Sequence, residues 1–338
     1  MLSTPGRHRA APHRSRLPLL LVLSLAGSSS SAWSANADSD ETPLPPLGWS
    51  SGSHFGCEVS DAVVRTTADA MVSSGMKSAG YQYVIIDDCW HSGRDEHGNL
   101  VADAQRFPAG MKALANYVHA RGLKFGLYAE SAQLTCQRRP GGSGSGGGSD
   151  AGASAGAGNG DTVQRDASQF AAWGVDEILY DWCAAGAWKD PELPPVGREG
   201  DSIEAYRSLL GLWAVLAAPL IAGNDLRDMD AVTRSLLVNR QVIAVNQDEL
   251  GAHGRRLRRD GDLDIWVRPL SDGAYAILLL NRGGGERAAT VNWSELGLPA
   301  RGALQLRDLW NGRSISRQRG SYSATVAPHA SQLLRVSP

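Results

Sequence analysis

Short apolar runs alternate with segments of helical periodicity through the first two thirds of the chain. The runs that predict strands are 47–51, 83–90 (YVIIDDCW), 124–130 (KFGLYAE), 177–183 (EILYDWC) and 217–223. Helical patterns cover 61–79, 111–121, 162–173, 204–216 and 227–239. Strands that alternate with helices predict a parallel sheet, and the apolar middles of these strands indicate that both faces are covered, as in a (β/α)8 barrel or a doubly wound sheet.

Polar and aromatic residues gather where these strands end: Trp49, Asp87, Asp88, Tyr128 and Asp181. A (β/α)8 barrel places its active site at this end of its strands. A single acid after a strand is more often a helix cap or a loop residue. Five such residues at the same end of four strands favour a binding or catalytic site.

The pattern becomes all-β from residue 257 onward. Six runs, at 263–270, 274–281, 288–293, 303–308, 321–326 and 332–336, lie between Gly, Asp and Ser turns and predict an antiparallel β-sandwich. We therefore divide the chain into a barrel domain at 38–251 and a sandwich domain at 252–338. The sandwich is expected to support the barrel, and sugar binding is the alternative.

The first 37 residues have the pattern of a cleaved export signal. Four arginines precede the apolar run 17–26, and Ala35-Asn36-Ala37 forms an A-x-A cleavage site before Asp38. We expect a secreted or periplasmic protein, and an uncleaved anchor is the alternative. Cleavage removes four arginines and no acid, so the net charge of −2 becomes −6. This charge gives no electrostatic reason to expect binding to nucleic acid or an anionic membrane.

Four cysteines follow the signal: Cys57, Cys89, Cys136 and Cys183. An even number in an exported protein favours disulfides, and four cysteines allow three pairings. None of the spacings is C-x2-C, so a structural zinc site is not expected. The tract 141–160 is nearly all Gly, Ser and Ala, and it predicts a flexible insertion.

The chain resembles the family 27 glycoside hydrolases, the α-galactosidases or melibiases. The resemblance rests on PPLGWSS, HFGCEVS, YQYVIIDDCW, KFGLYAE, ILYDWC, WKDPEL, LIAGNDLR and VIAVNQDELG, which cover most of 45–251. RDLW and PHASQLLRV extend it more weakly into the sandwich. The resemblance implies retaining hydrolysis of terminal α-linked galactose, with an α-galactoside as the substrate and no cofactor.

The resemblance also assigns roles to individual residues. Asp181 matches the catalytic nucleophile. Asp87 and Asp88 match the pair that binds galactose hydroxyls, Trp49 matches a residue that packs on the sugar, and Tyr128 matches a tyrosine that contacts the sugar. The disulfides of the family imply the pairs Cys57–Cys89 and Cys136–Cys183.

The chain departs from the family pattern most strongly after Cys183, where YDWC joins WKDP almost directly. The family places its fifth and sixth strands there, and with them the acid/base Asp. We therefore identify no acid/base residue. The span 47–246 holds 200 residues, whereas a complete barrel typically takes about 250, which indicates that two or three β/α units are missing.

Smaller departures lie close to the expected site. A Lys of the family is Leu179 here, a Trp-Asn pair is Gly52-Ser53, and an Asp is Glu130. The Asn and second Asp of a W-N-D-P-D motif are Lys189 and Glu192. We expect the missing Lys at position 179 to weaken substrate positioning.

Three hypotheses follow. The chain is an α-galactosidase by ancestry with low activity, an inactive galactoside-binding or scaffold protein, or the product of a deletion in a longer gene.

Overall fold

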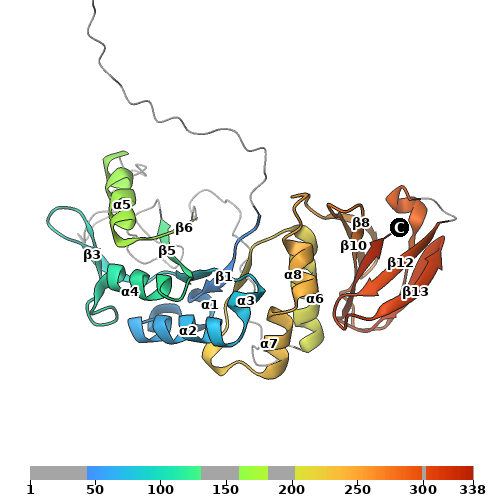
Figure 1. Ribbon diagram of the computed structural model, residues 1–338, viewed down its shortest axis with the longest axis horizontal. Coiled ribbons are helices and arrows are strands. Elements are labelled where there is room, and N and C mark those ends of the chain that lie inside the picture. The colour runs from blue at the N-terminus through green and yellow to red at the C-terminus, as the bar shows by residue number, and fades with distance from the viewer. Residues whose placement is uncertain (1–43, 131–159, 182–201, 299–301, 338) are drawn as a thin grey trace, which may run out of the picture. The chain divides into compact units, whose positions relative to one another are not determined.

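A five-stranded parallel sheet forms the centre of the first region (Figure 1). The structure is a computed structural model that describes residues 44–130, 160–181, 202–298 and 302–337. The strands are β1 (Leu47–Ser50), β2 (Tyr83–Ile86), β5 (Lys124–Glu130), β6 (Glu177–Asp181) and β7 (Leu220–Ala222), in the order β6-β5-β2-β1-β7. The last of these strands along the chain pairs with the first, as the closure of a barrel requires. The strands that would complete a barrel therefore belong between β6 and β7.

Two glycines allow the inner face of this sheet to pack closely. A Cβ on Gly48 would lie 2.8 Å from the Cβ of Tyr83, and a Cβ on Gly126 would lie 2.9 Å from Cγ1 of Ile85. Real Cβ atoms are not found at such distances from other heavy atoms. Neighbouring strands could not hold their present spacing with larger residues at either position.

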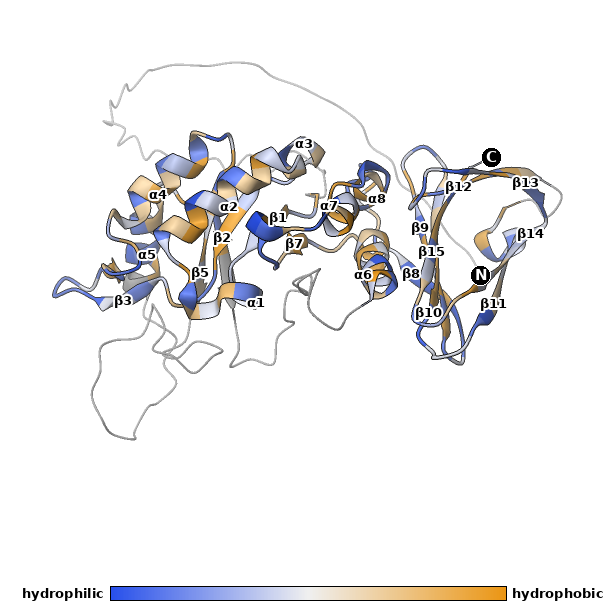
Figure 2. Ribbon diagram, turned by 90° about the horizontal axis from the view of Figure 1, so that it is seen from below, coloured by the Kyte–Doolittle hydropathy of each residue, from blue (hydrophilic) through white to orange (hydrophobic). Residues whose placement is uncertain are grey.

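Helices cover the outer face of the sheet. They are α1 (Gly52–Phe55), α2 (Asp61–Ser73), α3 (Met76–Ala79), α4 (Gly110–His119), α5 (Gly160–Trp173), α6 (Ile203–Leu216), α7 (Ala231–Leu237) and α8 (Arg240–Asn246). Figure 2 shows that β2, which they help to cover, is predominantly hydrophobic. Val64 and Met71 of α2, and Leu114 and Val118 of α4, are buried in one cluster with the sheet. No helix of the described residues is both long enough and apolar enough to cross a membrane.

The helix predicted at 61–79 is two helices. Ser60 caps the start of α2 by accepting a hydrogen bond from the backbone N–H of Val63. Gly75 then adopts a φ of 90°, which ends the first helix before α3 begins. Glycine takes this left-handed conformation without steric cost, so the chain can turn there.

A hairpin that the sequence did not predict joins β2 to α4. It consists of β3 (His91–Arg94) and β4 (Leu100–Ala102). Arg94 forms a bidentate ion pair with Asp166 of α5 at 2.7 and 2.6 Å, and both side chains are largely buried. The side-chain amide of Gln169 donates to the carbonyl of Leu100 and accepts from its N–H. These contacts attach α5 to the hairpin.

The second region is the predicted antiparallel β-sandwich. Its large sheet has the order β13-β12-β15-β10-β9-β8, and β11 pairs with β14 in the small one. The strands are β8 (Arg255–Asp260), β9 (Leu263–Pro269), β10 (Tyr275–Asn281), β11 (Arg287–Asn292), β12 (Ala303–Asp308), β13 (Ser314–Arg319), β14 (Ser321–Val326) and β15 (Ser331–Ser337). Ile265, Leu279, Val291, Trp293 and Leu306 share a buried cluster between the two sheets.

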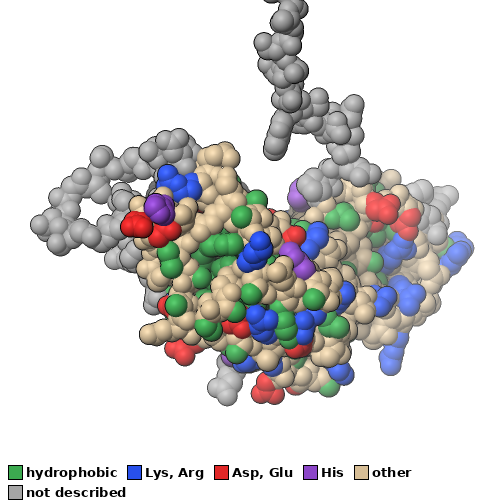
Figure 3. All heavy atoms as spheres, turned by 60° about the vertical axis from the view of Figure 1, so that its left-hand side comes forward, with side chains coloured by type: hydrophobic (Ala, Val, Ile, Leu, Met, Phe, Trp, Pro, Cys, Tyr) green, Lys and Arg blue, Asp and Glu red, His purple; other side chains and the backbone are tan. Residues whose placement is uncertain are grey.

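On the face shown in Figure 3, acidic and basic side chains lie among one another, in keeping with 35 acidic and 33 basic residues overall.

One buried arginine joins the sandwich to the last helices of the first region. Nη1 of Arg268, on β9, donates to the carbonyl oxygens of Ala214, Val245 and Asn246 at 3.0, 2.5 and 3.1 Å. These carbonyls lie in the last turns of α6 and α8, where a helix leaves acceptors unpaired and favours positive charge. Leu278 and Leu333 of the large sheet belong to the same hydrophobic cluster as α6.

Candidate active site

The carboxyl ends of five neighbouring strands lie along one edge of the parallel sheet. Ser50 ends β1, Asp87 follows β2, Glu130 ends β5 and Asp181 ends β6. Asn224 comes two residues after β7. The sheet thus brings together residues far apart in the sequence, at the edge where parallel α/β proteins bind their ligands.

The carboxylate of Asp87 is held by its neighbours at this edge. Oδ1 accepts a hydrogen bond from the backbone N–H of Asp88 at 2.6 Å, and Oδ2 accepts one from the Ser50 hydroxyl at 3.3 Å. The backbone N–H of Asp87 donates to Oγ of Ser51 at 3.0 Å. Ser50 and Ser51 were missed as site residues in the sequence. One feature of the sequence could have indicated them: Ser50 is the last residue of β1, and Ser51 directly follows it.

Asp88 differs from Asp87 because its carboxylate is almost fully buried. Asp88 as a whole residue is 6% exposed. Its Oδ1 accepts a hydrogen bond from the backbone N–H of Cys89 at 2.6 Å. Oδ2 is buried and has no hydrogen-bond partner within the described residues. A buried carboxylate oxygen without a donor is costly and is normally matched by one. A ligand hydroxyl can supply the donor that this oxygen lacks.

A disulfide fixes the turn that follows the two aspartates. Cys57 pairs with Cys89, as predicted, and their Cα atoms are 5.2 Å apart. Cys89 has a φ of 70°, a left-handed conformation that is uncommon outside glycine. The crosslink ties this turn to the segment after β1. Cys136 and Cys183, the second predicted pair, lie outside the described residues.

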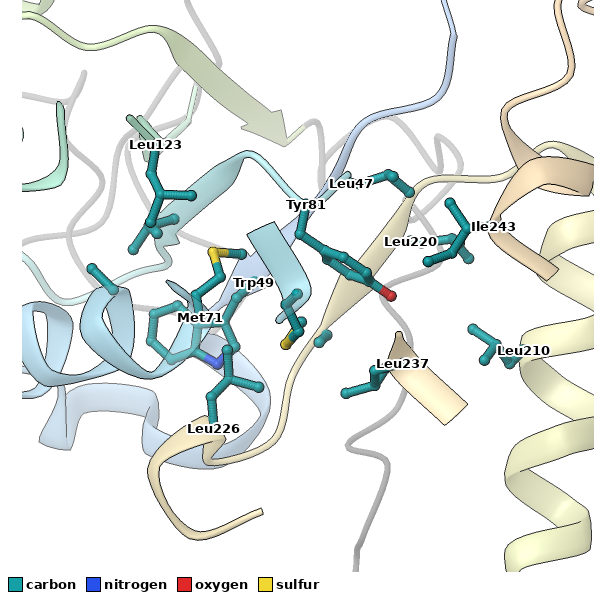
Figure 4. Packing of buried hydrophobic residues seen from close by; sticks show 14 of the residues in the cluster. Leu47, Trp49, Met71, Tyr81, Leu123, Leu210, Leu220, Leu226, Leu237 and Ile243 are labelled. Carbon is teal, nitrogen blue, oxygen red and sulfur yellow. The ribbon is translucent and has the colours of Figure 1, made fainter. Parts of the chain in front are cut away.

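Trp49 is fully buried behind the strand ends. Its side chain has no exposed surface, and its indole N–H donates to the carbonyl of Asn224 at 2.8 Å. Figure 4 shows its ring beside Met71 and Leu226, on the side of the sheet covered by α2. Trp49 joins β1 to the chain after β7 and fills the layer beneath α2. Its predicted contact with the sugar stays a prediction, since a side chain without exposed surface reaches no ligand in this conformation.

Tyr128 is positioned through the aromatic residue that follows Cys89. The indole N–H of Trp90 donates to the carbonyl oxygen of Tyr128 at 2.9 Å. Trp90 itself packs edge-on against Phe170 and Trp173 of α5. Tyr128 is partly exposed near the end of β5, and its predicted sugar contact stays a prediction.

The backbone of Asp181 lies at the predicted edge. The parallel register pairs Asp181 with Glu130 and Leu179 with Tyr128. The side chain of Asp181 is outside the described set, so its role as nucleophile also stays a prediction. Asp225, a further carboxylate after β7, accepts hydrogen bonds from Arg227 at 2.8 and 2.7 Å. Arg227 lowers the pKa of Asp225, which makes this carboxyl a poor proton donor.

Comparison with known proteins shows which family shares this arrangement. The family model described as alpha galactosidase A matches residues 45–185 and 183–248, and the alpha galactosidase C-terminal beta sandwich domain matches 260–336. The chain is 34% identical to an α-galactosidase of Cyamopsis tetragonoloba over 371 positions, covering 87% of this chain and 86% of the relative. It is 32% identical to α-galactosidase A of Cellvibrio japonicus, covering 96% and 100%. The chain therefore belongs to glycoside hydrolase family 27, the α-galactosidases.

Solved structures establish the fold. α-Galactosidase I of Mortierella vinacea superimposes with a TM-score of 0.75 at 24% identity, covering 87% of this chain and 96% of that one. The α-galactosidase of Saccharomyces cerevisiae gives a TM-score of 0.75 at 21% identity, covering 87% and 98%. Both support a (β/α)8 barrel followed by a β-sandwich.

The comparisons also locate an internal gap. The match to the first family model is broken at 183–185, where YDWC approaches WKDP. The alignment with the Cyamopsis enzyme spans 371 positions. It covers 87% of the 338 residues of this chain, which is about 294 residues. About 77 positions of the alignment therefore lack a counterpart in this chain. A βαβ unit takes 30 residues or more, so unmatched positions on this scale correspond to about two β/α units when they are assigned to the break. This agrees with the shortening inferred from the sequence.

Proposed function

We propose that the chain binds terminal α-D-galactosyl groups at the carboxyl edge of the sheet and hydrolyses α-galactosides slowly, with retention of configuration. The observation that carries the proposal is the pair of adjacent aspartates after β2. Asp87 is partly exposed and oriented by Ser50, whereas Asp88 is buried and its Oδ2 has no donor among the described residues. Charged acceptors in fixed positions suit the hydroxyl groups of a sugar.

The proposed chemistry uses Asp181 as the nucleophile. Its carboxylate attacks the anomeric carbon, the bond to the leaving oxygen breaks, and water later hydrolyses the glycosyl-enzyme. A retaining enzyme needs a second carboxyl group about 5–5.5 Å away that protonates the leaving oxygen and then activates the water. The break at 183–185 falls where the family carries this group. We therefore expect the leaving group to depart largely without a proton.

The alternative function is galactoside binding without turnover. It is favoured by the same two aspartates, because they are present while the acid/base segment is missing. The two functions share a binding site and differ in whether a glycosyl-enzyme forms.

Binding and turnover should be measured on the same protein. Methyl α-D-galactopyranoside is titrated by ligand-observed NMR, and nitrophenyl α-galactoside is followed by absorbance. We expect Asp88→Asn to weaken binding about tenfold or more, because it replaces a charged acceptor. Asp272→Asn, a matched change at an exposed acid of the sandwich, should have no effect. Turnover that is lost in Asp181→Asn supports hydrolysis, binding without turnover supports the alternative, and the absence of binding contradicts both.

We also propose that the chain is exported after removal of residues 1–37, which lie outside the described residues. The Cys57–Cys89 disulfide supports this, because such bonds persist in oxidising compartments. Mass spectrometry of the native protein should find Asp38 at the N-terminus, and an intact terminus in the cytoplasm would contradict export. Peptide mapping without reduction should also recover Cys136 linked to Cys183.

A further inference from the structure

We propose that the β-sandwich binds an anionic polysaccharide on the outer face of its large sheet, at the edge formed by β12 and β13. The ligand is a polymer that carries carboxylate or sulfate groups. The surface that would hold it is called the arginine face and consists of Arg307, Arg317, Arg319 and Arg335. Binding there is independent of the galactosyl site at the parallel sheet and of the hydrolysis proposed for it.

Charge is divided unevenly between the two regions of the chain. The sandwich domain, 252–338, contains 13 arginines, no lysine and seven acidic residues, which gives it a net charge of +6. The span 38–251 has a net charge of −12, so the total of −6 hides a strong asymmetry. An asymmetry of this kind indicates that the basic region has an anionic partner of its own.

Four of these arginines share one face of three neighbouring strands. Arg307 of β12 lies directly opposite Arg335 of β15 in the antiparallel register. Arg319 of β13 pairs with Ala303, which is four residues before Arg307 and therefore on the same face of β12. Alternation places Arg317, two residues before Arg319, on that face as well.

The arginine face is open to solvent along β12 and β13. The opposite face of β12 carries Leu304 and Leu306, which are buried between the two sheets. α6 packs against β9, β10 and β15, and β13 is the edge strand at the end of the sheet away from β8. Arg307, Arg317 and Arg319 are accordingly exposed.

Acidic partners are scarce on this face. Arg335 forms an ion pair with Asp272, and the other three arginines form none within the described residues. Asp308, the acid next to Arg307 in the sequence, lies opposite the buried Leu334 and so belongs to the inner face. Like charges directly opposite each other on neighbouring strands destabilise a sheet. A bound anion between Arg307 and Arg335 would remove this repulsion.

The chemistry of the face suits an acidic polysaccharide. Guanidinium groups bind oxyanions through paired hydrogen bonds. Gln305 and Ser337 lie opposite each other on the same face and can bind neutral sugar hydroxyls beside the charges. The described strands place no aromatic side chain among the arginines, whereas single-stranded nucleic acids are normally bound by stacking on aromatic rings. In a glycoside hydrolase, such a face retains a polymer near the enzyme.

The test is biolayer interferometry on the full chain at low salt. Polygalacturonate and dextran sulfate are the anionic probes, and unmodified dextran is the uncharged control. We expect wild type to bind at least one anionic probe but not dextran, and to lose affinity as salt is added, because salt screens exposed charges. Arg317→Gln/Arg319→Gln should weaken binding about tenfold, since two charged donors are lost. Arg255→Gln/Arg256→Gln removes the same charge from exposed positions of β8, at the opposite edge of the sheet, and should change binding less than about twofold.

The two probes also identify the anionic group, because tighter binding of polygalacturonate assigns carboxylates to the ligand and tighter binding of dextran sulfate assigns sulfates. Arg317→Lys/Arg319→Lys should keep most of the affinity, which separates the loss of charge from damage to β13. The proposal is wrong if neither anionic probe binds, or if the β8 variant loses as much affinity as the β13 variant. Equally tight binding of a DNA duplex or of phosphatidylglycerol vesicles, lost in the β13 variant, would assign the face to phosphate groups and would also overturn it.

Discussion

The β-sandwich and the parallel sheet of this chain respond differently to the loss of sequence. The sandwich has two paired sheets around its own buried cluster, and its family model matches in one piece. The parallel sheet has five described strands, and its family model is broken within the region. Antiparallel strands that follow one another pair locally, whereas a barrel closes only when every strand is in place. An internal gap therefore affects the barrel and its site while leaving the sandwich whole.

The largest expected effect comes from closing the gap. Inserting the missing positions of the Cyamopsis enzyme at 183–185 should raise hydrolysis of melibiose by at least about a thousandfold, because general acid catalysis contributes about 10²–10⁴-fold and closure would also organise the site. Steady-state kinetics of the chimera measure this. A chimera that folds, as judged by circular dichroism, but stays as slow as the present chain would contradict the assignment of the defect to the gap.

A matched pair of tryptophans compares the packing of the two regions. Trp49 lies under α2 and Trp293 lies in the sandwich, and both are fully buried. Each Trp→Ala change should lower the free energy of unfolding by about 3–5 kcal/mol. Hydrogen exchange should show lost protection around the parallel sheet for Trp49 and around the sandwich for Trp293. If Trp49→Ala changes neither exchange nor the urea midpoint, the shortened barrel is not stably packed.

The joint between the two regions has a smaller predicted contribution. Arg268→Met keeps most of the side-chain volume but removes the hydrogen bonds from Nη1 to the carbonyls of Ala214, Val245 and Asn246. Because Nε and Nη2 of Arg268 are buried without a partner among the described residues, their removal offsets part of this cost, and we expect a net loss of about 1–2 kcal/mol in urea unfolding. Arg317→Met, at an exposed arginine of β13, is the control and should change stability by less than about 0.5 kcal/mol. Equal effects of the two changes would show that the joint contributes nothing.

The smallest predicted effect is a pH dependence within the sandwich. Burial by itself would raise the pKa of Asp264, but hydrogen bonds and charge from Arg259 and Arg282 outweigh burial and lower it. A carboxyl with a lowered pKa stabilises the fold above its unfolded value of about 3.9 and loses that stabilisation as the pH falls. Asp264→Asn should therefore be destabilising at pH 7 and less so at pH 3. A deficit that is the same at both values would contradict this.

The sequence predicted the buried strands better than the edge strands. β2, β5, β9 and β10 have apolar runs because both their faces are covered. β8 and β13 were missed because RRLRRD and SISRQR carry little apolar pattern. β8 pairs with β9 and β13 pairs with β12, so each edge strand forms on a more apolar partner. Charged residues are common on such edge strands.

The site was predicted in part for a similar reason. The strand pattern placed Asp87, Asp88 and Asp181 at one end of the strands, and the sheet order brings their backbones to one edge. It could not show that Trp49 faces α2, because alternation along β1 does not say which face is covered by helices. The strand pattern also could not predict the hydrogen bond between the Asp87 N–H and Oγ of Ser51, because these residues follow different strands and lie 36 positions apart in the sequence.

The most direct test of the account is a comparison of two substrates with the present chain and the complete Cyamopsis enzyme. Melibiose needs a proton on its leaving oxygen, whereas nitrophenyl α-galactoside releases a stable phenolate and depends less on acid catalysis. We predict hydrolysis of melibiose at least about a thousandfold slower than by the complete enzyme, with a smaller deficit on the nitrophenyl substrate. Melibiose hydrolysis near the rate of the complete enzyme, abolished by Asp181→Ala, would contradict the account. It would show that another carboxylate, such as Glu130, Asp190 or Glu192, supplies the proton.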